Sequence, residues 1–403
     1  MIVYIITPIC IVLLLKFITA KDPPPKCGIY TQKNKWYPIK YWVFRCMLNL
    51  RKRQNKKTKS TTGSNAGYGM RSRNTPEDMD KTQILPADKP LAVDAAYFNA
   101  GNKDGQYMVA ATARRQKNVV QTILYLRIPE VGLLEMPSMP DTKLKGSEDN
   151  AFAAGGLKCQ VVEPMKKWKI SYNGKMRNRR TNKLEDVTFD LDWIAFTKYF
   201  DFDTDLHPSA MADAIAKEKW SRQYFDVLKS VHQTHYEQFG EISGTVKISG
   251  ENDKFIRIAG VRDHSYGNIR DWNYFHRYAL NYCTLSDRTA ICVGAICMPM
   301  TMSRLLVGYV LHPDGRMDSV SWSDFEFYQY GEDGNPPNEM TLNFTAGDKP
   351  YNMTISVEEA PIFYIGEGRD AVIHERFCKY DVNGLKGWGI SEWDYRNKDS
   401  QQK

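Results

Sequence analysis

Spacings typical of metal ligands are missing from this chain of 403 residues, which has eight cysteines and seven histidines. No two cysteines lie two residues apart, and none clusters with histidines, so we expect no metal site. A phosphate-binding glycine loop, a Rossmann fingerprint and a serine-hydrolase elbow are also missing. These gaps argue against nucleotide chemistry and against a serine hydrolase, and we expect no cofactor.

The cysteines that are present fit a reducing compartment better than a disulfide framework. Cys283, Cys292 and Cys297 lie in apolar runs typical of strands. A buried thiol in such a run behaves as a small hydrophobe, and this interpretation is favoured over disulfide pairing.

Acidic residues are scarce in only one part of the chain. The formal net charge is +8, yet residues 21–81 carry 15 Lys and Arg against 4 Asp and Glu, and residues 82–403 sum to −4. The basic character is therefore local, and the remainder is mildly acidic. Because the basic segment adjoins an apolar run and not a folded basic face, we do not expect nucleic acid as a partner.

The first twenty residues are predicted to form a membrane anchor. Residues 2–15 carry no charge, and residues 17–20 extend the run past Lys16 to about the length that crosses a bilayer. A cleaved signal peptide ending at Ala20 is the alternative, although no basic residue precedes the run. Positive charges follow it, which predicts a single-pass protein, in an endomembrane such as the endoplasmic reticulum, with its body facing the cytoplasm.

Two glycosylation-type triplets argue for the opposite orientation. They begin at Asn343 and Asn352 and could be used only if the folded part were lumenal. Two such triplets arise readily by chance in a chain of this length, so we give the flanking charges more weight.

Residues 21–84 are assigned to a basic juxtamembrane segment and linker. Within it, residues 36–45 mix aromatic rings with cations, and the basic run 51–53 follows. Amphipathic rings and polybasic stretches both favour the lipid headgroup layer, so we expect this segment to lie along the membrane surface with lipid as its partner. A solvated basic linker is the alternative.

From residue 85 onward the sequence is typical of a mainly β protein. Short β-rich runs occupy residues 85–205, apolar side chains recur at helical spacing over residues 206–240, and evenly spaced strands return over residues 241–396. Such strands, joined by short turns, favour a barrel or a sandwich. We predict two β halves joined by one connecting helix.

A dense polar cluster lies at residues 260–272, Gly-Val-Arg-Asp-His-Ser-Tyr-Gly-Asn-Ile-Arg-Asp-Trp. It follows the alternating run 255–259, which predicts that a strand ends here and that the chain turns at Gly260 and Gly267. Strand ends at the mouth of a barrel are places where ligand sites form.

The cluster contains the groups that acid–base catalysis needs. His264 can titrate near neutral pH, and an adjacent carboxylate can orient it. The candidate catalytic residues are His264, Asp263 and Tyr266. The candidate ligand-binding residues are Arg262, Arg270, Asp271, Trp272, His276 and Glu392. Ion pairing within the scaffold is the alternative for Arg262, Asp263 and Asp271, and helix-end capping is favoured for His232 and His235.

On these residues the chain resembles a known family. The Gly260–Gly267 and Arg270–Trp272 stretches, with His235–Gln238, His276–Tyr278 and Gly387–Trp393, are similar to a largely uncharacterised family of membrane-anchored animal proteins. That family is distantly similar to the hydroxyneurosporene synthase (carotenoid 1,2-hydratase) and AttH-like superfamily. The resemblance implies two lipocalin-like barrels and acid–base chemistry on polyenes without a cofactor, with His264 and Asp263 matching the protonating residues.

The sequence therefore leads to one main hypothesis and two alternatives. The main one is a membrane-anchored, lipocalin-like protein that binds a hydrophobic isoprenoid, polyene or lipid-like molecule and catalyses its hydration, cyclisation or isomerisation. The alternatives are a non-catalytic lipid carrier and a membrane-tethered scaffold. Substrate and oligomeric state are left open.

Overall fold

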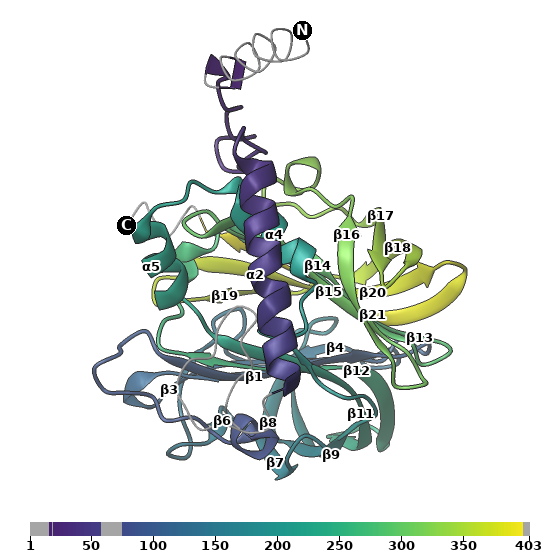
Figure 1. The fold of residues 1–403 in the computed structure, drawn as a ribbon. Coiled ribbons are helices and arrows are strands. Elements are labelled where there is room, and N and C mark those ends of the chain that lie inside the picture. Colours follow the sequence, from purple (N-terminus) through teal and green to yellow (C-terminus); the bar gives the residue numbers. More distant parts are fainter. Residues whose placement is uncertain (1–15, 18, 58–74, 398–403) are drawn as a thin grey trace, which may run out of the picture.

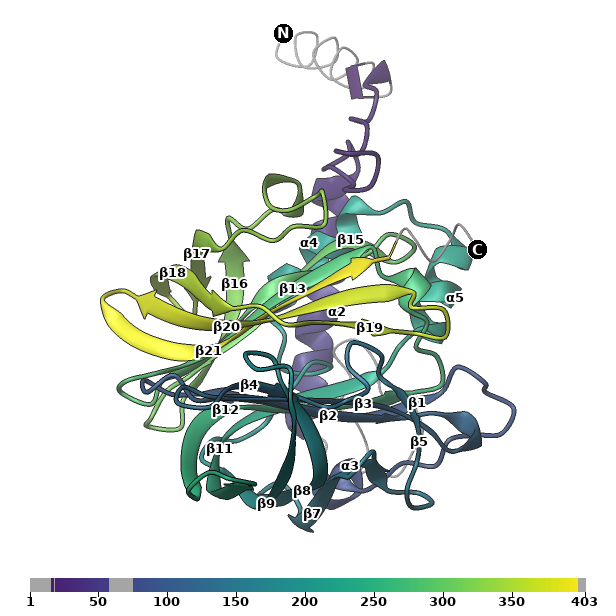
Figure 2. The same cartoon turned by 180° about the vertical axis from the view of Figure 1, so that it is seen from behind.

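The computed structural model describes residues 16–17, 19–57 and 75–397, which form two β-barrels one above the other (Figures 1 and 2). Each barrel closes from eight antiparallel strands. The prediction of a mainly β protein with two barrel-like halves is therefore confirmed. The predicted anchor at residues 1–20 lies almost wholly outside the described residues.

The first barrel runs in the order β11-β12-β1-β2-β3-β4-β8-β9 and closes where β9 pairs with β11. Its strands are β1 (Val93–Gly101), β2 (Tyr107–Arg114), β3 (Val119–Ile128), β4 (Gly132–Glu135), β8 (Lys167–Asn178), β9 (Leu184–Ala195), β11 (Thr234–Ile248) and β12 (Lys254–Gly267). Four shorter strands extend this sheet: β5 (Lys143–Lys145), β6 (Phe152–Ala154), β7 (Leu157–Glu163) and β10 (Phe200–Asp201).

The second barrel runs in the order β18-β17-β16-β15-β14-β13-β21-β20 and closes where β20 pairs with β18. Its strands are β13 (Arg277–Leu285), β14 (Ala290–Met298), β15 (Met302–Leu311), β16 (Met317–Ser323), β17 (Glu339–Ala346), β18 (Lys349–Glu359), β20 (Ala371–Val382) and β21 (Leu385–Arg396), with β19 (Ile362–Ile365) beside β20.

The predicted boundary between the halves is wrong. Strands β11 and β12 were expected to open the second half at residue 241, but they pair with β9 and β1 and complete the first barrel. The reason is burial, because Ile242 and Ile258 carry apolar side chains that the first barrel encloses. The second barrel therefore begins at Arg277.

The connection also differs from the single helix expected over residues 206–240. Two helices occur there, α4 (Pro208–Lys217) and α5 (Arg222–Ser230), and β11 already starts at Thr234. The His207 side chain accepts a hydrogen bond from the backbone N–H of Ser209 and caps α4, which opens with proline in its first turn. Ser221 caps α5 in the same way.

Helix α2 (Tyr37–Lys57) runs along the outside of the body and packs against α4 (Figure 1). Phe44 and Leu48 are buried in this contact, and the Tyr37 hydroxyl donates a hydrogen bond to Asp213 Oδ1 at 2.6 Å. The short helix α3 (Pro76–Asp80) reaches the first barrel. No helix within residues 16–17, 19–57 and 75–397 is both long enough and apolar enough to cross a membrane.

Candidate functional site

Strand β12 distributes the predicted polar cluster over its two faces. The chain does not turn at Gly260, because this glycine lies within the strand, opposite Ala100 of β1 and Gly240 of β11. A Cβ atom at residue 260 would lie 2.0 Å from the carbonyl oxygen of Asn99, so only glycine permits this close approach. Since side chains alternate along a strand, neighbours in the cluster point in opposite directions.

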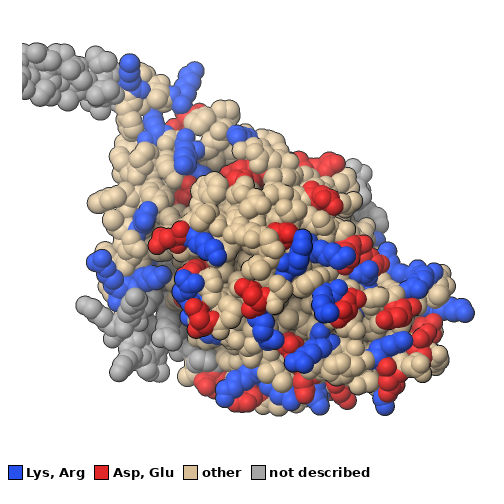
Figure 3. Space-filling model, turned by 90° about the vertical axis from the view of Figure 1, so that its right-hand side faces the viewer, with Lys and Arg blue, Asp and Glu red and all other residues tan. Residues whose placement is uncertain are grey.

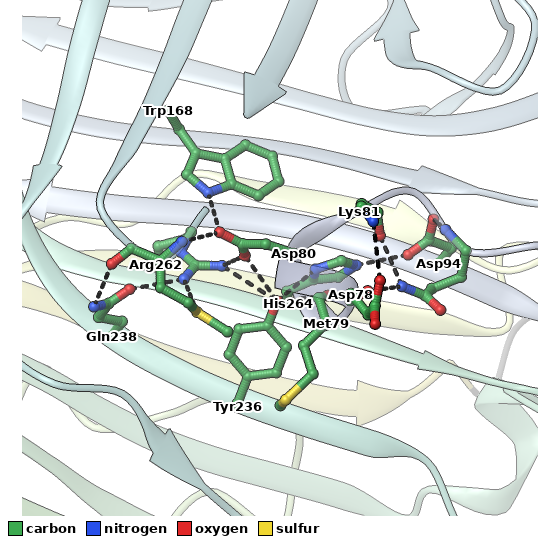
Figure 4. A network of polar contacts seen from close by, with 12 residues as sticks. Asp78, Met79, Asp80, Lys81, Asp94, Trp168, Tyr236, Gln238, Arg262 and His264 are labelled. Carbon is green, nitrogen blue, oxygen red and sulfur yellow. Dashed lines mark hydrogen bonds and ion pairs between the residues drawn. The ribbon is translucent and has the colours of Figure 1, made fainter. Parts of the chain in front are cut away.

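Arg262 and His264 point into the first barrel and are fully buried there (Figure 4). His264 Nδ1 lies 2.8 Å from the Tyr236 hydroxyl, and His264 Nε2 lies 2.7 Å from Asp94 Oδ1. Arg262 forms an ion pair with Asp80, which comes from α3. We call these five residues the interior network.

The interior network fastens α3 to the barrel wall. Asp80 Oδ1 accepts a hydrogen bond from the Tyr236 hydroxyl at 2.8 Å, and Asp80 Oδ2 accepts one from Trp168 Nε1 at 3.2 Å. Arg262 also donates to Gln238 Oε1 at 2.8 Å. Both ring nitrogens of His264 are occupied and its side chain has no exposed surface, so this histidine acts in the scaffold and cannot reach a ligand.

The opposite face of β12 borders a cavity of about 200 Å³ between the two barrels. Strands β11 and β12 supply one wall, and β13, β14, β15 and β21 supply the other. Most of the lining is apolar, and it includes Phe202, Leu206, Phe275, Leu280, Met302 and Leu305. Mostly apolar clefts with a few polar groups are typical of small-molecule sites.

Ionisable side chains enter this apolar cavity from both barrels. His235 and Asp263 come from the first barrel, and Glu392 comes from the second. His235 Nε2 lies 3.6 Å from Asp263 Oδ1. The Tyr278 hydroxyl, on β13, donates a hydrogen bond to Glu392 Oε1. The two barrels thus bring three titratable groups to one apolar space.

Glu237 lies behind these groups and links the barrels. It is fully buried on β11, and its Oε1 lies 3.2 Å from His235 Nε2. The Tyr282 hydroxyl donates to Glu237 Oε1 at 3.0 Å, and the Tyr309 hydroxyl donates to Oε2 at 2.6 Å. Both tyrosines belong to the second barrel, so one carboxylate of the first barrel binds two phenols across the interface.

Burial and neighbouring charges shift the pKa values of the cavity groups. Burial raises the pKa of Glu392 to about 7, and the carboxylates of Asp263 and Glu237 act in the same direction. The pKa of Asp263 is also raised, first by burial and then by Glu237, although His235 opposes this. Burial alone would lower the pKa of His235, but Asp263 and Glu237 outweigh it and the net shift is upward.

Three polar atoms of cavity-lining residues lack a hydrogen-bond partner. Asp203 Oδ2, Asp263 Oδ1 and Trp272 Nε1 are buried and make no hydrogen bond with the described residues, although Asp263 Oδ1 lies 3.6 Å from His235 Nε2. Arg270 is held in place, because its Nε donates to Gln233 Oε1 at 2.8 Å. Carboxylate oxygens and an indole N–H with unused hydrogen-bonding capacity therefore belong to the residues of the cavity wall, beside a fixed guanidinium.

The structure brings four of the nine predicted site residues to the cavity, namely Asp263, Arg270, Trp272 and Glu392. Arg262 and His264 belong to the interior network. Tyr266 packs its ring against His264, Asp271 caps the turn at Trp272–Tyr274, and His276 lies near Glu332 and Tyr30. These last three do not line the cavity.

Sequence reasoning missed His235, Glu237 and Tyr282 as residues of this site. His235 was assigned to helix capping, but it lies in β11, and His232 is the histidine next to α5, with Nε2 2.7 Å from Asp203 Oδ1. The alternation His235-Tyr236-Glu237 was a usable signal, because it places His235 and Glu237 on one face of a strand. Nothing local indicated that this face meets a second barrel.

Within the described part of the chain, no group of three or more His, Cys, Asp or Glu side chains is arranged to hold a metal ion. The described cysteines are all free, and five of them are buried. Burial raises the pKa of the Cys283 thiol, which keeps it protonated.

Comparisons with known proteins bear on the fold and on the family. The structure is similar to that of the AttH candidate NE1406 from Nitrosomonas europaea, with a TM-score of 0.52 and 11% identity over 80% of this chain and 99% of that one. Kievitone hydratase from Nectria haematococca gives a TM-score of 0.46 and 12% identity, over 76% and 90% of the two chains. CghA with Sch210972 gives 0.47 and 10%, over 76% and 89%.

At such low identity the likeness to NE1406 establishes a shared fold and nothing about chemistry. It confirms the expected AttH-like, lipocalin-type architecture. Nothing in the comparisons supports an animal origin. No curated protein matches the chain by sequence. Residues 4–395 match the family described as "Family of unknown function (DUF8627)", and the chain belongs to that family.

Proposed function

We propose that this protein is a cofactor-independent acid–base enzyme that hydrates, cyclises or isomerises a hydrophobic small molecule held between its barrels. One observation carries the proposal: titratable side chains from both barrels, with pKa values raised by burial, project into a mostly apolar cavity. Perturbed titratable groups in a cleft are a mark of catalytic sites.

In the proposed reaction, protonated Glu392 gives its proton to a carbon–carbon double bond of the ligand. The cation that forms then accepts water, accepts an internal nucleophile, or loses a proton from a neighbouring carbon. These three outcomes are hydration, cyclisation and isomerisation. In each case one proton returns to Asp263 or Glu392, so the protein ends with the charge it started with.

His235 and Arg270 complete the proposed site. His235 lies beside Asp263, which raises the pKa of the imidazole, and the two groups can exchange a proton. Arg270, fixed by Gln233, can hold an oxygen of the ligand. Tyr278 keeps its proton, because burial raises its pKa well above the usual value, and it orients the Glu392 carboxyl.

The apolar lining favours an isoprenoid, polyene or lipid-like substrate, in line with the sequence resemblance. The second candidate function is a non-catalytic carrier, which would bind the same class of ligand in this cavity without converting it. A membrane-tethered scaffold without a ligand is a third. The membrane anchorage, the endomembrane localisation and the cytoplasmic orientation likewise stand as proposals based on the charge pattern.

Solvent isotopes separate an enzyme from a carrier. The full-length protein would be incubated with a total apolar lipid extract in D₂O and, separately, in H₂¹⁸O, and the extract analysed by untargeted mass spectrometry. An enzyme leaves carbon-bound deuterium in its product, and a hydratase also leaves ¹⁸O. Glu392→Gln should abolish the label, whereas Glu163→Gln, at an exposed position on β7, should not.

A further variant tests whether the cavity is the place of reaction. Leu280→Trp fills the apolar space and should abolish both labelling and the co-purification of lipid. Lipid that co-purifies with the wild-type protein without any isotope incorporation identifies a carrier. If neither binding nor labelling depends on residues 280 and 392, the proposed site is wrong.

A further inference from the structure

We infer that the outer face of α2 docks on the surface of an anionic lipid bilayer. This inference goes beyond the proposed function and does not depend on it. Four large apolar side chains on this helix, Ile39, Trp42, Val43 and Leu50, are exposed, and Trp42 is 67% exposed. Trp36, just before the helix, is exposed as well. We call these five residues the α2 stripe.

The α2 stripe is continuous along one side of the helix. Its members recur at spacings of three, four and seven residues, which places them on one face of an α-helix. The opposite face is also occupied, because Phe44 and Leu48 are buried against the body. Helix α2 therefore has an apolar face that holds it to the protein and a second apolar face that is exposed in the described structure. On this second face Trp36 contacts the ring of Phe17, with 4.9 Å between the ring centroids.

The charges of α2 identify the partner. The helix contains seven Lys and Arg, among them Arg51, Lys52 and Arg53, and no Asp or Glu. On the barrel face shown in Figure 3, by contrast, basic and acidic side chains are interspersed. An apolar, tryptophan-bearing stripe on a uniformly basic helix is the combination that binds the headgroup layer of anionic membranes.

A second copy of the chain is a poorer occupant. Pairing two α2 helices through their stripes would bring two sets of positive charges together without a negative partner, and like charges across an interface oppose association. An anionic lipid surface supplies the missing negative charge and accepts the exposed rings of Trp36 and Trp42.

The inner face of α2, opposite the α2 stripe, lies close to the inter-barrel cavity. Leu48 and Lys52 border a small hollow together with Phe202, Leu206 and Met211, and these last three also line the cavity. Docking through α2 therefore brings that side of the cavity towards the membrane surface.

A site-specific fluorophore on the full chain tests the inference. Cys10, Cys27 and Cys46 are replaced by Ser, since the remaining cysteines are buried, and an environment-sensitive dye is attached at Val43→Cys. The matched control carries the dye at Phe255→Cys, an exposed apolar position on β12 that lies far from α2 in the sequence. Both proteins are reconstituted into phosphatidylcholine vesicles with and without phosphatidylserine.

The expected result is a blue shift of the dye at residue 43 in vesicles that contain phosphatidylserine, with quenching by a headgroup spin label and no change at residue 255. Neutralising Arg51, Lys52 and Arg53 to Gln should remove most of the shift. Unchanged emission at residue 43 overturns the inference. So does an equal shift without phosphatidylserine, or one that appears without lipid and grows with protein concentration, which would indicate a second copy.

Discussion

Glu375 and Glu392 lie directly opposite each other on the neighbouring strands β20 and β21. Glu375 has no exposed surface and Glu392 is 9% exposed. Two buried carboxyls this close cannot both ionise cheaply. Burial and then the charge of Glu392 raise the pKa of Glu375 well above its usual value, so Glu375 stays protonated and Glu392 is the member that titrates near pH 7.

Replacing Glu392 by Gln should stabilise the protein above pH 7. The pKa of this carboxyl is 4.5 in the unfolded chain and about 7 in the fold. The free energy of unfolding therefore falls as the pH rises from the first value to the second. Gln carries no proton to lose, so we expect a gain of roughly 3 kcal/mol at pH 8 and little change at pH 4. Urea unfolding at both pH values measures this difference.

The matched control for that experiment is Glu163→Gln, because Glu163 is exposed and pairs with Lys166 at the surface. Its free energy of unfolding should change little at either pH. Equal effects of the two substitutions at pH 8 would show that Glu392 ionises normally.

Replacing His264 by Ala should destabilise the fold by about 3 kcal/mol, because it leaves Asp94 and Tyr236 without their buried partner and opens a hole in the barrel. Replacing His235 by Ala should cost less stability, since that side chain is 25% exposed, yet should abolish isotope incorporation. Denaturation curves measure the structural role expected of His264, and the labelling assay measures the catalytic role expected of His235. A stable but inactive His264→Ala protein would contradict this assignment.

The pair Asp80 and Arg262 should show strong coupling. Arg262→Met strands a buried carboxylate and should cost roughly 3–5 kcal/mol. Adding Asp80→Asn to that variant removes the stranded charge, so the double variant should be more stable than the sum of the single costs predicts, by about 1–3 kcal/mol. A double-mutant cycle in urea measures the coupling, and additive costs would mean that α3 is not fastened by this ion pair.

Glu237→Gln should lower the pKa of His235. The upward shift of that pKa depends on the carboxylates of Asp263 and Glu237, and the substitution removes one of them. The amide keeps an oxygen that accepts from one of the Tyr282 and Tyr309 hydroxyls, and its N–H group can donate to the other. NMR titration of the His235 ring protons reports the change. Glu241→Gln, on the same strand but paired with Arg257 at the surface, is the control. An unchanged His235 pKa in Glu237→Gln would mean that Glu237 does not set it.

The sequence predicts many residues of the candidate site, but it does not predict which of them lie inside the first barrel and which line the cavity. Residues 260–272 are recognisable as a polar cluster, and alternation alone implies that Arg262 and His264 face one way and Asp263 the other. Which face is enclosed in the first barrel and which borders the cavity depends on contacts between distant residues. Asp80 pairs with Arg262, 182 residues away, and accepts a hydrogen bond from Trp168, 88 residues away. No local pattern contains that information.

The sequence by itself determined the mainly β class, the presence of helical structure after residue 206 and the unusual charge of α2, because turn chemistry, side-chain period and composition act over a few residues. Tertiary structure alone decided that β11 and β12 complete the first barrel, that His264 is enclosed, and that His235, Asp263 and Glu392 share one cavity. These outcomes depend on strand pairing and burial between segments that are distant in the sequence. Such contacts produce no periodic pattern of residues that could be recognised in the sequence.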